Sequence, residues 1–154
     1  MMQVLAALLA GVGAPIGAYI GRLAKTELKE GERNIRLLGH VLLSVIVYFA
    51  LAEYLTSTWF PVLAALVTGG ALIYYDFHAV KHKAPSFIII VILALILFSF
   101  LNNEDFALIA SLMFMYNVAI GTLCDVAKTW RLSLQYAAAF LIAFGLAWGL
   151  SFSK

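Results

Sequence analysis

Residues 81–101, KHKAPSFIIIVILALILFSFL, join a short basic segment to an apolar run in which Ser99 is the one polar residue. Such a run approaches the length that crosses the hydrocarbon core of a bilayer, and its side chains favour contact with lipid. Of the 154 residues in the chain, 64% are hydrophobic and 12% are charged. An ordinary soluble domain is about half apolar and about a quarter charged. The composition therefore predicts an all-α, polytopic integral membrane protein.

Basic segments alternate with apolar spans along the chain, and this alternation predicts the topology. All but one of the ten Lys and Arg residues lie in three segments, which contain Arg22, Lys25, Lys29, Arg33 and Arg36, then Lys81 and Lys83, then Lys128 and Arg131. Loops rich in Lys and Arg remain in the cytoplasm. We therefore expect six transmembrane helices arranged as three hairpins, with the basic loops cytoplasmic and both termini on the outer side.

The expected helices form a single domain and cover approximately residues 3–21, 37–55, 59–77, 86–101, 106–126 and 132–151. In the first loop, from Arg22 to Arg36, alternating charges predict a surface ion-pair network with a turn at Gly31. The ends of the first and fifth helices resemble each other, as LAKT at 23–26 and VAKT at 126–129. A threefold or inverted internal repeat is one explanation, and chance coincidence of two tetrapeptides is the other.

Composition and motifs exclude several classes of function. The net charge of +2 follows from the topology, so the lipid bilayer is the expected partner and nucleic acid is not. The single cysteine, Cys124, excludes an internal disulfide and a multi-cysteine zinc site. The chain contains no G-x-S-x-G elbow, P-loop or HExxH motif, which are common signatures of catalysis. The sequence identifies no cofactor.

Small residues recur at four-residue spacing in the first and last helices, where they form stripes along one helix face. The stripes consist of Gly13, Gly17 and Gly21 in the first helix, and of Ala139, Ala143 and Ala147 beside Gly145 and Gly149 in the last. Small residues let transmembrane helices approach closely. We expect tight helix packing, within the chain or between copies of it, and a sliding surface or pore lining is the alternative.

The fifth helix carries the most suggestive polar face, with Asn117, Gly121 and Asp125 at four-residue spacing. Asn117 falls near the middle of the bilayer, where an unpaired amide is costly, so it must face protein or water. This face could coordinate a cation or relay protons, with Gly121 permitting close approach. The alternative is an interhelical hydrogen bond at Asn117 and an interfacial salt bridge at Asp125.

The third helix ends in a segment rich in aromatic and ionisable residues, YYDFHAVKH at 74–82. His78 and His82 lie one turn apart, a spacing that lets two imidazoles bind one metal, and His40 is expected near the same membrane depth. Asp76 and Asp125 are expected at that depth as well, which predicts a polar vestibule on the cytoplasmic side. Solvated loop residues are the alternative explanation of these histidines.

These features support three hypotheses about function. The first is a small transporter or channel for an ion or polar solute, acting as a homo-oligomer and using Asp76, Asn117 and Asp125. A transport path must then reach Asn117, and a dry interior there would count against this hypothesis. The second is a noncatalytic membrane subunit that docks on other proteins through its small-residue faces. The third is an intramembrane, metal-dependent enzyme acting on lipid.

Overall fold

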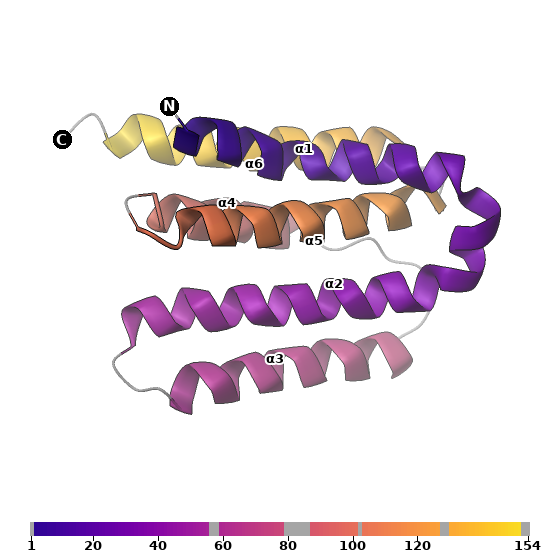
Figure 1. Ribbon diagram of the computed structural model, residues 1–154, viewed down its shortest axis with the longest axis horizontal. Coiled ribbons are helices and arrows are strands. Elements are labelled where there is room, and N and C mark those ends of the chain that lie inside the picture. The colour runs from indigo at the N-terminus through magenta and orange to yellow at the C-terminus, as the bar shows by residue number, and fades with distance from the viewer. Residues whose placement is uncertain (1, 56–58, 79–86, 102, 127–129, 152–154) are drawn as a thin grey trace.

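The computed structural model is all-helical over the residues that it describes, which are 2–55, 59–78, 87–101, 103–126 and 130–151 (Figure 1). Its helices are α1 (Met2–Leu23), α2 (Lys25–Tyr54), α3 (Trp59–His78), α4 (Phe87–Ser99), α5 (Phe106–Val126) and α6 (Trp130–Ser151). No strand occurs in these ranges. The predicted helical class is therefore confirmed for the described part of the chain.

Four of the helices are long and apolar enough to cross a membrane. The apolar stretches are Gln3–Leu23 in α1, Glu30–Tyr54 in α2, Phe106–Leu123 in α5 and Arg131–Gly149 in α6. Each has at least the 18 residues that a helix needs to span the hydrocarbon core. The apolar stretches described in α3 and α4, Trp59–Ala71 and Ile89–Ser99, are shorter. These helices are compatible with a location in the membrane.

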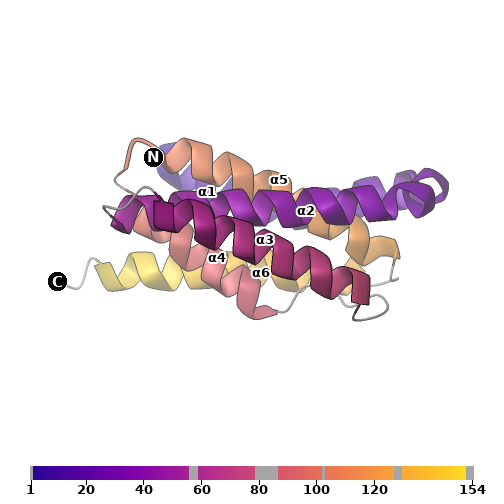
Figure 2. The same ribbon diagram turned by 90° about the horizontal axis from the view of Figure 1, so that it is seen from below.

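The helices form an interlocked bundle in which α1 and α5 lie side by side and run in the same direction (Figures 1 and 2). α6 packs on α1, and α2 packs on α5. The outer helices follow the same scheme, because α4 packs on α6 and α3 packs on α2. Consequently, α2 contacts α5 more extensively than it contacts α1, its neighbour in sequence.

The ends of the bundle are defined by short connections. The side-chain amide of Gln3, at the start of α1, donates a hydrogen bond to the carbonyl of Leu101 in the α4–α5 connection. The start of α1, the end of α2 and the α4–α5 connection therefore lie at one end of the bundle (Figure 1). The α1–α2 turn lies at the opposite end.

α2 begins at Lys25, well before the expected start at residue 37, and Gly31 lies inside the helix. The expected loop with a turn at Gly31 is therefore wrong. Ala24 alone separates α1 from α2, with φ −103° and ψ 29°. Two pairs of opposite charge suit a helix here, because Glu30 and Arg33 are three residues apart and Glu32 and Arg36 are four apart, so the members of each pair lie on the same side of the helix. Arg36 accordingly pairs with Glu32, one turn earlier.

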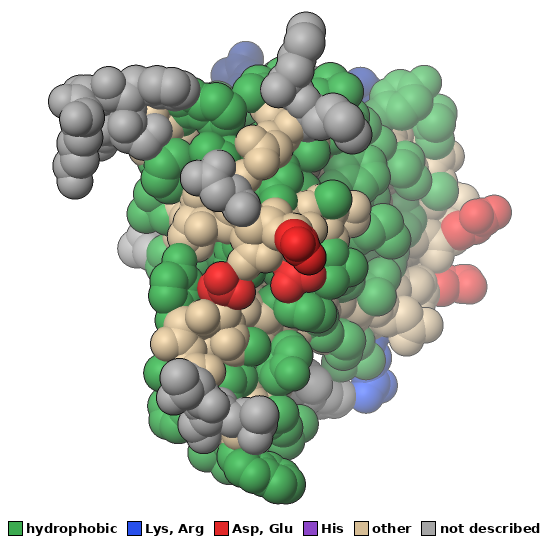
Figure 3. Space-filling model, turned by 60° about the vertical axis from the view of Figure 1, so that its left-hand side comes forward, with side chains coloured by type: hydrophobic (Ala, Val, Ile, Leu, Met, Phe, Trp, Pro, Cys, Tyr) green, Lys and Arg blue, Asp and Glu red, His purple; other side chains and the backbone are tan. Residues whose placement is uncertain are grey.

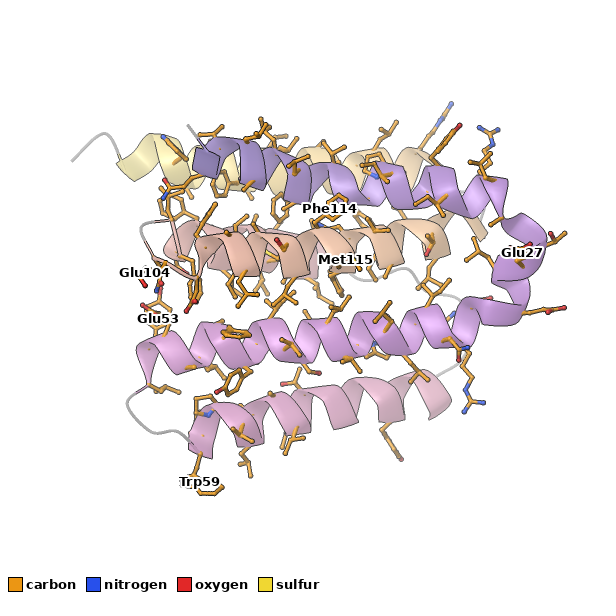
Figure 4. The ribbon with its side chains drawn as sticks, in the orientation of Figure 1. Glu27, Glu53, Trp59, Glu104, Phe114 and Met115 are labelled. Carbon is orange, nitrogen blue, oxygen red and sulfur yellow. The ribbon has the colours of Figure 1, made fainter. Side chains whose placement is uncertain are left out.

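The hydrophobic core lies among α1, α4, α5 and α6, and α2 adds Leu43 and Ile46 to it. Its largest fully buried apolar side chains include Ile90, Leu93, Leu97, Phe100, Ile109, Met113 and Phe140. In α5, 56% of the apolar stretch is buried, whereas in α2 the buried share of the apolar stretch is 11%. The α2–α3 pair is therefore the most exposed part of the bundle, and Trp59 at its end, 82% exposed, points away from the other helices (Figure 4).

Candidate functional site

The closest helix contact in the described structure is the crossing of α1 and α5, where backbone meets backbone. A methyl group placed on Gly17 would overlap the carbonyl oxygen of Val118 and lie 2.8 Å from its carbonyl carbon. A methyl group on Gly121 would overlap the carbonyl oxygen of Ala14 and lie 2.8 Å from that carbonyl carbon. Glycine is required at both positions because no side chain stands between the helices that could move aside. The sequence predicted close packing here, and the structure identifies α5 as the helix that α1 contacts.

Asn117 lies one turn before Gly121 at the same crossing, and its side chain is 1% exposed. Its Nδ2 donates a hydrogen bond of 2.8 Å to the carbonyl oxygen of Ala10. Gly13 provides the space that this side chain needs, because a methyl group there would lie 3.0 Å from Asn117 Cβ and 2.7 Å from the carbonyl oxygen of Phe114. We call Gly13, Gly17, Asn117 and Gly121 the α1–α5 seam.

The amide of Asn117 is only half satisfied. Its Oδ1 is buried and accepts no hydrogen bond from the described residues. Leaving a buried acceptor without a donor costs about 1–3 kcal/mol. Buried unpaired groups in native structures call for a specific explanation, such as a bound water, an ion or a functional role. The seam therefore contains one acceptor whose partner is not supplied by the described part of the protein.

Other buried polar side chains lie on α5 and α6, and sequence reasoning did not single them out. Thr122 is 5% exposed, and its hydroxyl donates to the carbonyl of Ala119 at 2.6 Å, within α5. Ser133 and Tyr136 on α6 are 0% and 3% exposed. Tyr116 on α5 is also 3% exposed. Hydroxyl groups in apolar helices carry no periodic signal, so the sequence gives little warning of such a group.

The expected cytoplasmic vestibule falls largely outside the described side chains. Asp76 and His78 belong to the last turns of α3, and Asp125 belongs to the end of α5. Their side chains, like the whole of His82, lie outside the described part. His40 is partly buried on α2, and its carbonyl accepts a hydrogen bond of 2.8 Å from Ser44 Oγ. The described residues alone contain no group of three or more His, Cys, Asp and Glu placed to hold a metal, so the metal site stays a prediction.

The small residues of α6 divide into two sets. Ala139 is buried, whereas Ala143 and Ala147 are half-buried. Gly145 and Gly149 are exposed, and a methyl group on either would have no neighbouring atom within 4 Å.

The close contact between α1 and α6 lies instead at Gly11, which sequence reasoning missed. A methyl group there would lie 2.9 Å from Leu141 Cδ2 and 3.1 Å from Phe140 Cδ1. Gly21, the remaining glycine of the first stripe, is buried on α1. The glycine stripe of α1 is thus a buried face, whereas the two glycines of α6 lie on the surface.

Acidic side chains gather at the end of the bundle that holds the start of α1 (Figure 3). Glu53 from the end of α2 lies near Glu104 from the α4–α5 connection (Figure 4), and both are exposed. Asp105 is exposed beside Glu104, and its backbone N–H donates to Asn103 Oδ1 at 3.0 Å. These acids are far along α5 from the buried amide, so they form a surface feature separate from the seam.

The seam can hold a species that donates a hydrogen bond or carries positive charge, because Asn117 Oδ1 is an acceptor only. One N–H of Nδ2 already donates to the Ala10 carbonyl, whereas Oδ1 accepts from none of the described residues, so the seam suits a donor or a cation better than an anion. In this structure the amide is enclosed, at 1% exposure, so any ligand reaches it only after the surrounding helices separate. The chain matches no known family model, no curated protein and no solved structure.

Proposed function

We propose that the chain crosses the membrane six times, as three hairpins with cytoplasmic basic loops and outer termini. The distribution of charge along the bundle supports this topology. The exposed acids Glu53, Glu104 and Asp105 occupy one end, and the α1–α2 turn, flanked by Arg22 and Arg33, occupies the other. Segments rich in Lys and Arg are retained in the cytoplasm, so the end with the α1–α2 turn is the inner one.

Within this topology the proposed function is transport or channel conduction of a small cation or hydrogen-bond-donating solute. The observation that carries it is the buried, unpaired Oδ1 of Asn117. A polar group held inside the hydrocarbon region is expensive, and such groups commonly mark ion and substrate pathways. Carbonyl oxygens are also the ligands that hard cations prefer, whereas anions require donors.

The structure corresponds to a closed state in this proposal. Asn117 is enclosed, and the backbone contacts at Gly17 and Gly121 leave the crossing of α1 and α5 no room to slide. The solute therefore reaches Oδ1 only if α5 becomes accessible on a side away from Gly17. Met115 lies on the α2 side of α5 and is 50% exposed, which makes the boundary with α2 the looser one (Figure 4).

The test is cation flux in proteoliposomes, with K⁺, Na⁺ and methylammonium as probes. Asn117→Leu removes the acceptor while keeping the shape of the side chain. We expect it to lower flux of the transported probe by about tenfold or more, as loss of a hydrogen bond to a charged group of about 1.5–3 kcal/mol implies. Ser111→Ala is the control, because Ser111 is exposed on the same helix and its hydroxyl donates to the Ala107 carbonyl of that helix.

Two results would contradict transport at this site. One is that none of the three probes crosses vesicles containing the folded wild-type chain. The other is that Asn117→Leu conducts as well as Ser111→Ala and the wild type.

The exposed glycines of α6 favour a second candidate, a membrane subunit or homo-oligomer that docks through this helix. Gly145 and Gly149 lie one turn apart with open space around them, and such pairs commonly admit a second helix. Gly145→Leu should then release copurifying chains, or convert an oligomer to monomers, without unfolding the protein. Mass measurement in detergent reports the difference, and an unchanged mass would oppose this candidate. Gly17→Leu is unsuitable for the same purpose because Gly17 packs against α5 of its own chain.

A further inference from the structure

The contacts at the α1–α5 seam are reciprocal. Adding 104 to a residue number in α1 gives its counterpart in α5, so that Gly17 corresponds to Gly121 and Ala14 to Val118. Gly17 approaches the backbone of Val118, and Gly121 approaches the backbone of Ala14. In both cases an added methyl group would overlap the carbonyl oxygen and lie 2.8 Å from the carbonyl carbon. The third neighbour differs, since it is Val118 Cα for Gly17 and Ala18 N for Gly121, so the two halves match at the carbonyl group.

The same relation extends one turn toward the start of each helix. Gly13 corresponds to Asn117, and Ala10 corresponds to Phe114. Asn117 reaches the carbonyl of Ala10. Reciprocally, the Cβ position of Gly13 lies 2.7 Å from the carbonyl of Phe114. One side of the pair has a side-chain amide on the opposing carbonyl, and the other side has an empty position.

Any two parallel helices that pack through small residues can form a symmetric crossing. The helices around them therefore show whether the symmetry extends beyond this one contact. Exchanging α1 with α5 also exchanges their packing partners, because α6 covers α1 and α2 covers α5. In the outer layer α4 covers α6 and α3 covers α2, but α3 and α4 run in opposite directions, so the relation is limited to the two hairpins (Figure 1). α2 follows α1 in sequence and α6 follows α5, so each hairpin is interlocked with the other.

The sequence carries a trace of the same relation. Ile16-Gly17 matches Ile120-Gly121 at a separation of 104, and LAKT at 23–26 matches VAKT at 126–129 at a separation of 103. The two separations differ by one residue, which places a single-residue insertion or deletion between the seam and the helix ends. Both matches connect α1 to α5 in the parallel sense that the structure has, rather than in an inverted sense.

We infer that the α1–α2 and α5–α6 hairpins are two parallel, interlocked repeats related by a local two-fold axis along the bundle, with Gly13 as the pseudo-equivalent position of Asn117. The buried amide therefore lies at the interface between the repeats. Transporters built of parallel repeats place their solute sites at such interfaces, near the bilayer midplane. The assignment of the amide as a solute-binding group rests on the proposed function, whereas the repeat relation rests on the contacts alone.

The repeat relation implies that one amide, and no more than one, fits at the axis. A side chain on residue 13 would lie 3.0 Å from Asn117 Cβ, so two asparagines cannot face each other there. If the two positions are equivalent, moving the amide from α5 to α1 gives it the Phe114 carbonyl as its new acceptor. The helices must then separate by a few tenths of an ångström, because that carbonyl oxygen lies 2.7 Å from the Cβ position of residue 13. The exchange also moves one glycine in return, so the helix propensities of the two helices nearly cancel.

The experiment is a double-mutant cycle on the full-length chain in detergent or bicelles, with Gly13→Asn, Asn117→Gly and the exchange of both. Unfolding is followed by circular dichroism against added SDS. We expect each single substitution to destabilise the fold. The unfolding equilibrium constant of the exchange variant should be about tenfold smaller than the product of the two single effects predicts, because residues in contact are energetically coupled.

Phe114 opposes a side chain at residue 13 in two ways, because its carbonyl oxygen lies 2.7 Å and its ring Cδ2 lies 3.3 Å from the Cβ position there. The cycle is therefore repeated in a Phe114→Ala background, where the ring is absent. Recovery by the exchange in either background supports the repeat relation. Additive effects in both backgrounds, or failure of the exchange to fold in both, overturn it.

Cation flux through the same four proteins separates this inference from the proposed function. With both correct, the exchange restores flux together with stability. If the exchange restores stability but the chain conducts none of the probes, the repeat relation is supported and transport is contradicted. If the destabilisation is additive but flux depends on Asn117, transport is supported and the repeat relation is contradicted.

Discussion

The seam between α1 and α5 and the contact between α2 and α3 both rest on glycine, but they are built differently. At the seam, Gly17 faces a backbone carbonyl, which cannot move without displacing a whole helix. At the α2–α3 contact, Gly69 faces the hydroxyl of Ser44, which a methyl group would approach to 2.5 Å. A hydroxyl can rotate away. The comparison shows that the atom opposite a glycine, rather than the glycine itself, decides whether a helix contact is rigid.

The largest expected effect comes from filling the seam. Gly17→Ala places a methyl group against the Val118 backbone and should cost about 3 kcal/mol or more, the upper part of the overpacking range. Gly121→Ala should behave alike, because it meets Ala14 in the same way. SDS unfolding of the purified chain measures both, and a cost below that of Gly69→Ala would reverse the comparison.

Truncating the amide should have the next largest effect and separates packing from polarity. Asn117→Ala loses the bond to Ala10 and leaves a cavity, and should cost about 1–2 kcal/mol. Asn117→Leu fills the space and also removes the unpaired Oδ1, so it should lie within about 1 kcal/mol of the wild type. The same unfolding assay ranks the two. Equal costs would mean that the hydrogen bond, and not the filling of the site, stabilises this part of the seam.

The α2–α3 contact should tolerate the substitution that the seam rejects. Gly69→Ala displaces the Ser44 hydroxyl from its bond to the His40 carbonyl and should cost about 1 kcal/mol or less. The adjacent Gly70 is exposed, with no atom within 4 Å of an added methyl group. Gly70→Ala is therefore the matched control, and it should stabilise α3 slightly through helix propensity. A large cost at Gly70 would show that another surface covers α3.

The smallest effect is expected at the start of α2, which is held by contacts within its own helix. Glu32→Gln removes the charge that pairs with Arg36 one turn later. Both side chains are partly exposed, at 18% and 23%, so the loss should be about 0.5 kcal/mol and should shrink in high salt. Helicity measured by circular dichroism at low and high salt reports it, and an effect independent of salt would argue against an ionic contribution.

The sequence predicted the helical class well because apolar runs separated by basic segments determine it. The expected limits of the third, fifth and sixth helices agree closely with α3, α5 and α6. The prediction is wrong at the start of α2, because the charged residues 25–36 indicate a loop, whereas in the structure they extend the helix beyond its apolar stretch. The sequence of α4 is apolar all round, so no pattern could tell that Ile90, Leu93 and Leu97 face the core and Ile92 and Leu95 do not.

The candidate site was predictable in part. The cost of an amide in the bilayer placed Asn117 against protein, and its bond to Ala10 is an interhelical hydrogen bond of the kind weighed as an alternative. The partner itself could not be predicted, because backbone carbonyls leave no mark in the sequence. Gly11 was missed for a similar reason, since its neighbours Phe140 and Leu141 come from a helix whose register against α1 the sequence does not give. Transport through this site would require a path to Asn117, and in this structure that residue is enclosed at 1% exposure.

The bond from Asn117 to Ala10 joins residues 107 positions apart, and this separation has a consequence for biosynthesis. The ribosome completes α1 long before α5 exists, so in the proposed six-helix topology the glycine face of α1 waits unpaired while α2, α3 and α4 are synthesised. Final assembly in that topology requires the fifth helix. A chain that stalls before residue 121 carries an open glycine face, which is a surface that an intramembrane chaperone or quality-control protease can recognise.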